Sequence, residues 1–208
     1  MACQELHIDN VHISLGEREL LQLDRRVSGG EILTVMGPSG SGKSTLLAYL
    51  AGFLPAAFNA DGSIWIGDRN LTCLPAEQRR LGLLFQDPLL FPHLSVAENL
   101  WFGMPAQRQD KQALATQSLR EMGLEGFENR DPATLSGGQK SRVALLRTLL
   151  SEPVAVLLDE PFNKLDAGLR REVRETVFAR LRNAGLPVVL VTHDQEDAEA
   201  AGGEVVSL

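Results

Sequence analysis

The sequence has few of the residues that mark several classes of protein. Only two cysteines occur among 208 residues, Cys3 and Cys73, and they do not have metal-ligand spacing. We therefore expect two free thiols in a reducing cytosol. The first residues contain neither a basic start nor an apolar run, which argues against a signal peptide. No apolar stretch approaches the ~20 residues needed to span a bilayer, so action at a membrane would require docking on a protein that spans it.

Positive charge is also scarce. The chain carries 20 lysines and arginines against 27 aspartates and glutamates, a formal net charge of −7. The basic residues are scattered, and a short group such as Gln78-Arg79-Arg80 does not form a patch, which argues against nucleic acid as a partner. Internal repeats, low-complexity tracts and dividing linkers are missing too. We therefore expect a single domain over residues 1–208.

Three short apolar runs, rich in β-branched residues, predict strands that are buried on both faces of a parallel sheet. Each run leads into a polar turn. The runs are residues 32–36, 154–158 and 188–191, and the turns are Gly37–Ser44, Asp159-Glu160 and Thr192-His193-Asp194. Because ligands in such folds gather at the carboxyl ends of the strands, these turns are expected to form one site.

The segments around these runs follow other patterns. Residues 1–30 and 56–75 contain short alternating stretches that predict antiparallel strands. Residues 87–150 are mainly helical in pattern, and apolar positions four residues apart predict another helix over residues 169–181. The expected fold is therefore an α/β P-loop fold, with a parallel core flanked by helices, an antiparallel β subdomain and a helical subdomain inserted at about residues 87–150.

The strongest chemical signal is a complete G-x-x-x-x-G-K-S between a predicted strand and a predicted helix. Its residues are Gly37, Pro38, Ser39, Gly40, Ser41, Gly42, Lys43 and Ser44, followed by Thr45. The glycines let backbone N–H groups face phosphate oxygens, and the positive end of the next helix adds to this attraction. Lys43 would carry a charge to the β- and γ-phosphates, and Ser44 would offer a hydroxyl to Mg²⁺.

Two adjacent carboxylates, Asp159 and Glu160, follow the second apolar run. Asp159 is suited to bind Mg²⁺ directly or through water, and Glu160 to polarise an attacking water as general base. Such adjacent charges repel, and a cation would relieve the repulsion. Taken alone, such a pair would more often be a solvated acidic turn, but the phosphate loop in the same chain favours the catalytic interpretation.

A second anion site is predicted at Leu135-Ser136-Gly137-Gly138-Gln139, which opens a helical pattern. Together with the phosphate loop, this stretch resembles the signature of the ATP-binding cassette family, and the resemblance covers nearly the whole chain. In that family two cassettes pack head to tail around two ATP and Mg²⁺. The resemblance therefore implies a homodimer in which Ser136 to Gln139 contact the γ-phosphate held by Lys43 of the other copy.

Other family elements occur in order along the chain. Gln86 resembles the Q-loop residue that senses Mg²⁺ and the transmembrane partner, Asp166 resembles the end of the D-loop, and His193 resembles the switch histidine on the γ-phosphate. The chain departs from the family in two places. Leu15 stands where an aromatic residue usually stacks on adenine, a loss of about 0.5–1.5 kcal/mol, and Asn163-Lys164 stands where the D-loop usually has Ser-Ala.

The residues Asp159-Glu160-Pro161-Phe162 and the segment Pro88 to Phe102 resemble those of importer ATPases. The resemblance is greatest to compact bacterial importer ATPases near the thiamine-transport type. The resemblance implies an integral membrane permease, a periplasmic or extracellular substrate-binding protein, and a place on the cytoplasmic face of the membrane. The sequence ends fifteen residues after His193, so a regulatory domain is not expected. An exporter or lipoprotein-release ATPase is the first alternative, and a non-transport cassette ATPase is the second.

Overall fold

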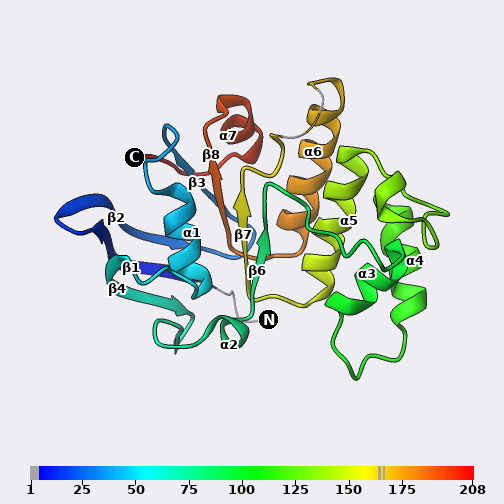
Figure 1. Cartoon of the computed structure of the whole chain (residues 1–208), viewed down its shortest axis with the longest axis horizontal. Coiled ribbons are helices and arrows are strands. Elements are labelled where there is room, and N and C mark those ends of the chain that lie inside the picture. The colour runs from blue at the N-terminus through cyan, green and yellow to red at the C-terminus, as the bar shows by residue number, and fades with distance from the viewer. Residues whose placement is uncertain (1–4, 164, 166) are drawn as a thin grey trace. The chain divides into compact units, whose positions relative to one another are not determined.

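The computed structural model describes residues 5–163, 165 and 167–208, and the chain divides into two compact units (Figure 1). The first unit runs to Leu83 and takes in Val154–Glu160 and Phe178–Leu208, and the second contains Leu84–Pro153 and Pro161–Val177. Three residues named above, Cys3, Lys164 and Asp166, lie outside the described residues. Cys73 is exposed as a free thiol.

A five-stranded sheet with the order β6-β7-β8-β3-β9 contains the three predicted apolar runs at its centre. Its strands are β3 (Ile32–Met36), β6 (Leu81–Leu84), β7 (Ala155–Asp159), β8 (Val188–Thr192) and β9 (Val205–Ser207). β3 pairs in parallel with β8 and with β9, and β7 pairs in parallel with β8. All residues of β8 are buried, as the apolar pattern predicts for a strand covered on both faces. The α/β fold expected from the sequence is thereby confirmed.

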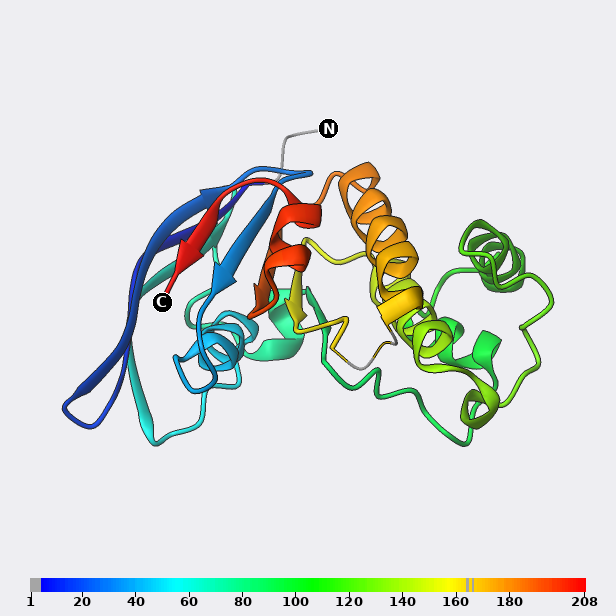
Figure 2. The same ribbon diagram turned by 90° about the horizontal axis from the view of Figure 1, so that it is seen from above.

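A second sheet in the first unit is antiparallel, with the order β2-β1-β4-β5. It is formed by β1 (Leu6–Leu15), β2 (Arg18–Val27), β4 (Phe58–Ile66) and β5 (Arg69–Asn70). Buried and less buried residues alternate along most of β1, so one face of this sheet packs into the core. Figure 2 shows the sheet as a separate layer beside β3 and α1 (Lys43–Ala51). The alternating segments of the sequence therefore form the predicted antiparallel strands.

Helix α1 (Lys43–Ala51) follows β3 and packs against β7 and β8. Its buried Leu46 and Leu50 share one apolar core with Val35 of β3 and Ile8 of β1. This packing fixes the start of α1 at the carboxyl end of β3. Helix α7 (Gln195–Ala201) follows β8 and packs against β3 and β8, and the four-residue helix α2 (Ala76–Arg79) precedes β6.

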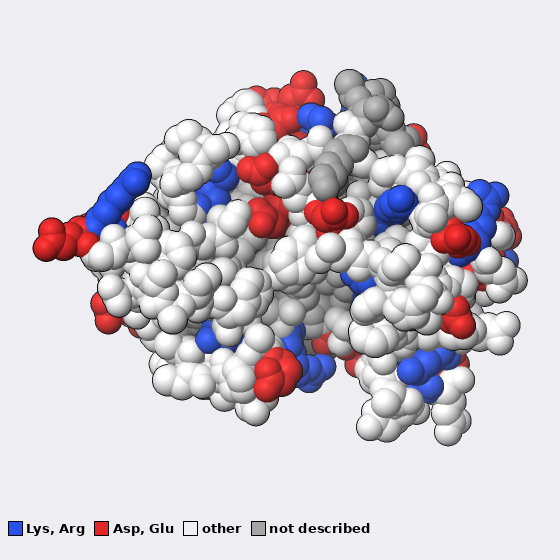
Figure 3. Space-filling model, in the orientation of Figure 1, with Lys and Arg blue, Asp and Glu red and all other residues white. Residues whose placement is uncertain are grey.

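The second unit contains α3 (Val96–Gly103), α4 (Lys111–Glu121), a 3₁₀ turn (Pro132–Thr134) and α5 (Gly137–Leu150). Helix α3 packs against both α4 and α5. Helix α6 (Ala167–Asn183) begins in the second unit and ends in the first. Among the described residues, no helix is both long and apolar enough to cross a membrane. Basic and acidic side chains are interspersed on the face shown in Figure 3.

Candidate functional site

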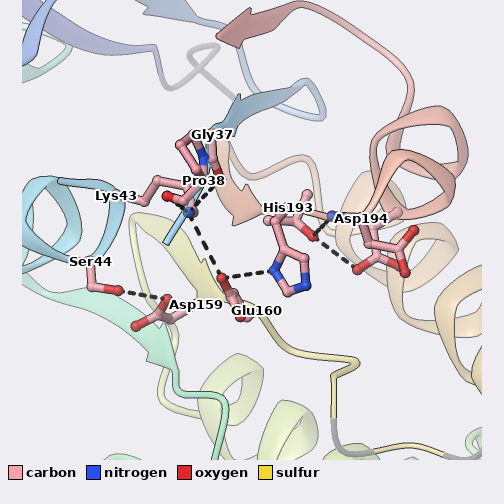
Figure 4. A network of polar contacts seen from close by, with 10 residues as sticks. Gly37, Pro38, Lys43, Ser44, Asp159, Glu160, His193 and Asp194 are labelled. Atoms are coloured by element: carbon pink, nitrogen blue, oxygen red, sulfur yellow. Dashed lines mark hydrogen bonds and ion pairs between the residues drawn. The ribbon is translucent and has the colours of Figure 1, made fainter. Parts of the chain in front are cut away.

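The loop between β3 and α1 closes around the amine of Lys43. This side chain is only 5% exposed, and its Nζ donates hydrogen bonds to the carbonyl oxygens of Gly37 (2.7 Å) and Pro38 (2.9 Å) (Figure 4). Gly42 caps α1 with φ 96°, and no side chain caps the helix at that end. The backbone N–H groups at the start of α1 thus lie beside a buried cation, an arrangement that attracts phosphate.

Asp159, at the end of β7, accepts a hydrogen bond of 3.2 Å from the hydroxyl of Ser44. Burial raises the pKa of Asp159, the Ser44 hydroxyl opposes this shift, and the neighbouring charge of Glu160 adds to it. A cation beside Asp159 would therefore lower the cost of ionising it.

The Ser44 and Asp159 oxygens fit Mg²⁺, which prefers hard oxygen ligands. Among the described residues there is no group of three or more histidine, cysteine, aspartate or glutamate side chains able to hold a metal. This is compatible with Mg²⁺, which binds in nucleotide sites through one or two side chains plus phosphate oxygens and water.

Glu160 lies between two nitrogen-bearing side chains from other strand ends. Its Oε1 is 3.1 Å from Nδ1 of His193 and 4.0 Å from Nζ of Lys43, and the carboxylate is 19% exposed (Figure 4). Its backbone has φ 44°, in the left-handed region, and its N–H donates to the carbonyl of Val191. Such a conformation costs of order 1 kcal/mol and is common where a side chain must be aimed at a site.

His193 follows β8 in a turn that its neighbours fix. The Asp194 N–H donates to Oγ1 of Thr192, and the Asp194 carboxylate accepts from the N–H of Glu196 at the start of α7. The imidazole is about half exposed and still contacts Glu160. The turn therefore places the imidazole of His193 against the carboxylate of Glu160.

Leu15 ends β1 as a 45% exposed side chain, opposite Arg18 of β2 and Phe58 of β4. The sequence alone does not predict that Phe58 lies beside Leu15, because only the register of the sheet pairs the two residues. Phe58 is partly buried and packs against the apolar core of the first unit. The adenine role of Leu15 stays a prediction.

Arg79 is a second residue whose role the sequence alone does not predict. It is 5% exposed and lies at the end of α2. Its guanidinium donates to the carbonyls of Tyr49 and Leu50 at the carboxyl end of α1, and to those of Thr72 and Leu74. Arg79 thus holds the end of α1 opposite Lys43. Nothing in the local sequence separates it from the exposed Arg80 beside it.

The predicted Q-loop and signature residues belong to the second unit. Gln86 is exposed in the loop after β6. Ser136 caps α5 in a reciprocal arrangement with Gln139: its Oγ accepts from the Gln139 N–H, and its N–H donates to the Gln139 Oε1. Ser136 and Gly137 are exposed, and Gly138 is buried. The site residues that the structure brings together within one unit are Lys43, Ser44, Asp159, Glu160 and His193.

The chain is similar in sequence to known ATP-binding proteins, as a phosphate-binding site of this kind would lead one to expect. The sequence model of the family described as "ABC transporter" matches residues 20–163. An "Uncharacterized ABC transporter ATP-binding protein YnjD" from Escherichia coli (strain K12) is 46% identical over 198 residues, which cover 94% of this chain and 91% of the relative.

Two other relatives are named as import proteins. A "Thiamine import ATP-binding protein ThiQ" from Jannaschia sp. (strain CCS1) is 41% identical over 207 residues, 98% of this chain and 88% of the relative. A "Spermidine/putrescine import ATP-binding protein PotA" from Marinobacter nauticus is 41% identical over 196 residues, 93% of this chain and 52% of the relative. The chain thus spans most of the first two relatives and about half of the third.

Proposed function

Because this chain belongs to the ABC transporter family of ATP-binding, ATP-hydrolysing proteins, we propose that it powers solute uptake through a membrane permease. The observation that carries the chemistry is the position of Glu160 between Lys43 and His193, beside the Ser44–Asp159 pair. The importer names of similar proteins support the direction of transport.

In the proposed mechanism, Lys43 and the start of α1 bind the β- and γ-phosphates, and Lys43 exchanges its loop carbonyls for phosphate oxygens. Glu160 orients the attacking water and takes its proton, while His193 holds the glutamate by its Oε1. Mg²⁺, held by Ser44 and Asp159, would neutralise charge on the phosphate oxygens.

The proposed active form is a homodimer in which each copy completes the ATP site of the other. The support is the signature: exposed Ser136 and Gly137 stand at the N-terminus of the 14-residue helix α5, where backbone donors attract an anion. Light scattering on the Glu160→Gln variant should show dimers with ATP and monomers with ADP. A monomer at saturating ATP would argue against ATP-driven closure.

The proposed permease contact lies in the segment Pro88 to Phe102. We call Leu89, Phe91 and Phe102 the docking rim, because Leu89 is 54% and Phe102 is 67% exposed and Phe91 packs on Phe102 with ring centroids 4.5 Å apart. An exposed apolar rim of this kind suits the apolar face of a partner helix. Leu89 is more exposed than Leu90, which is partly buried, so Leu89 is the better position to probe.

Co-purification with the permease tests this assignment. Leu89→Asp should abolish recovery of the permease, since burying an unpaired charge in an interface costs several kcal/mol. Phe53→Asp is the matched control, because Phe53 is 48% exposed in the first unit, outside the rim. Equal recovery of permease by wild type and Leu89→Asp would contradict the docking surface. Bound to the permease, the protein would lie on the cytoplasmic face of the membrane. A substrate-binding protein of the same complex would lie on the opposite, periplasmic or extracellular, face.

A further inference from the structure

Arg147 joins helix α5 to the start of the docking segment. It lies near the end of α5, partly buried, and its two terminal nitrogens donate to backbone carbonyls: Nη1 to Leu89 (2.9 Å) and Nη2 to Pro88 (3.1 Å). Burial lowers the pKa of Arg147, yet a guanidinium stays protonated at neutral pH. The forked cation therefore fixes two successive peptide groups of the segment.

The backbone that Arg147 holds is strained. Leu89 has φ 45°, in the left-handed region that branched side chains rarely occupy. This conformation turns a leucine side chain outward, where it is 54% exposed. A strained residue persists only where its surroundings over-determine it. The two bonds from Arg147 to the carbonyls on this turn supply that constraint.

Arg147 also contacts the aromatic part of the docking rim. Its guanidinium carbon lies 5.4 Å from the centre of the Phe91 ring, and Phe91 packs edge-on against Phe102 of α3. Gly103, at the end of α3, lies close to the backbone of α5 at Arg147, since a Cβ there would be 2.5 Å from the Arg147 carbonyl oxygen. All three rim residues are thus linked to one side chain, directly or through Phe91.

We propose that Arg147 is a positioning residue that couples the signature end of α5 to the docking rim. Arg147 lies eleven residues after Ser136, roughly 16 Å along a stiff helix at 1.5 Å per residue. When Ser136 binds nucleotide, any movement of α5 would also move the Pro88–Leu89 turn. The docking rim that contacts the permease would then move with this turn. This inference rests on the docking surface proposed above.

Hydrogen exchange on the nucleotide-free chain tests the positioning itself. In Arg147→Met, the amide of Phe91, which donates to Oδ1 of Asn99, should exchange at least about 10-fold faster. Amides in the middle of α5 should change little. Arg142→Met is the matched control: Arg142 lies on the same helix and donates to the carbonyl of Met122, away from the rim. Faster exchange along all of α5, or no change at Phe91, would overturn the proposal.

Permease binding tests the coupling. Arg147→Met should weaken co-purification and lower the ratio of permease-stimulated to basal ATPase rate, and Arg147→Lys should restore only part, because one ammonium does not reproduce the fork.

Two outcomes separate the claims. If wild type and Arg142→Met bind the permease and Arg147→Met binds equally well, the role of Arg147 is overturned while the docking surface stands. If wild type itself fails to bind, the proposed function is contradicted, and the coupling role of Arg147 falls with it.

Discussion

Replacing Arg79 by methionine should destabilise the protein more than most single substitutions. The guanidinium is 5% exposed, and it makes four hydrogen bonds of 2.7–2.8 Å to the carbonyls of Tyr49, Leu50, Thr72 and Leu74. Methionine keeps much of the side-chain length and fills the site, but it donates nothing. Four carbonyls, two of them at the carboxyl end of α1, would lose this charged donor.

The magnitude follows from the bonds and from the cost of the buried charge. A hydrogen bond to a charged group contributes about 1.5–3 kcal/mol, but burial of the guanidinium, which lowers the pKa of Arg79, opposes part of this gain. A net loss of about 4 kcal/mol is therefore expected. At about 2–4 °C per kcal/mol for a chain of this size, Tm should fall by about 8–16 °C.

Thermal unfolding followed by circular dichroism at pH 7 measures this loss. Arg69→Met is the control, because Arg69 donates to the carbonyl of Gln78 from an exposed position nearby; its Tm should change by less than about 3 °C. A drop of similar size in both variants, or a drop under about 3 °C in Arg79→Met, would refute the claim that Arg79 anchors α1.

Three further predictions concern nucleotide binding and pH. Leu15→Tyr should tighten ATP binding by about 0.5–1.5 kcal/mol through stacking, measured by titration with ATP and with GTP; no change would remove residue 15 from the base site. Lys43→Ala should abolish ATP binding in the same titration, and retained affinity would exclude Lys43. Hydrogen bonds from Ser95 lower the pKa of Glu98 below its ordinary value. The ionised carboxylate therefore stabilises the folded chain at pH values above the ordinary glutamate pKa, and this stability is lost as pH falls through the lowered pKa. Glu98→Gln should thus be less stable than wild type at pH 7, with a difference that shrinks in acid; a constant difference would contradict this.

The parallel core could be predicted because its signals are local. Each central strand is a short apolar run, and each polar turn follows such a run directly, so the common carboxyl edge places Lys43, Asp159 and His193 near one another. The start of α5 could be predicted in the same way, because Leu135 to Gln139 lead directly into a helical pattern. The reciprocal bonds between Ser136 and Gln139 are a finding of the structure.

Other features depend on contacts that are remote in sequence. Arg79 and the exposed Arg80 are neighbours in the chain, and only the position of α1 separates their roles. Leu89 adopts a left-handed conformation that its residue type disfavours, and its carbonyl accepts a hydrogen bond from Arg147, which is far along the chain. The pairing of Phe58 with Leu15 required the sheet register. Tertiary contacts override local preference at each of these places.

The central claim is that Glu160 acts as general base in the site formed by Lys43, Ser44, Asp159 and His193. The most direct test is single-turnover ATP hydrolysis by wild type and Glu160→Gln, with ATP binding measured separately on both. The account predicts nearly equal binding and hydrolysis slower by about 10²–10⁴-fold in the variant. Near-normal turnover in Glu160→Gln would contradict it.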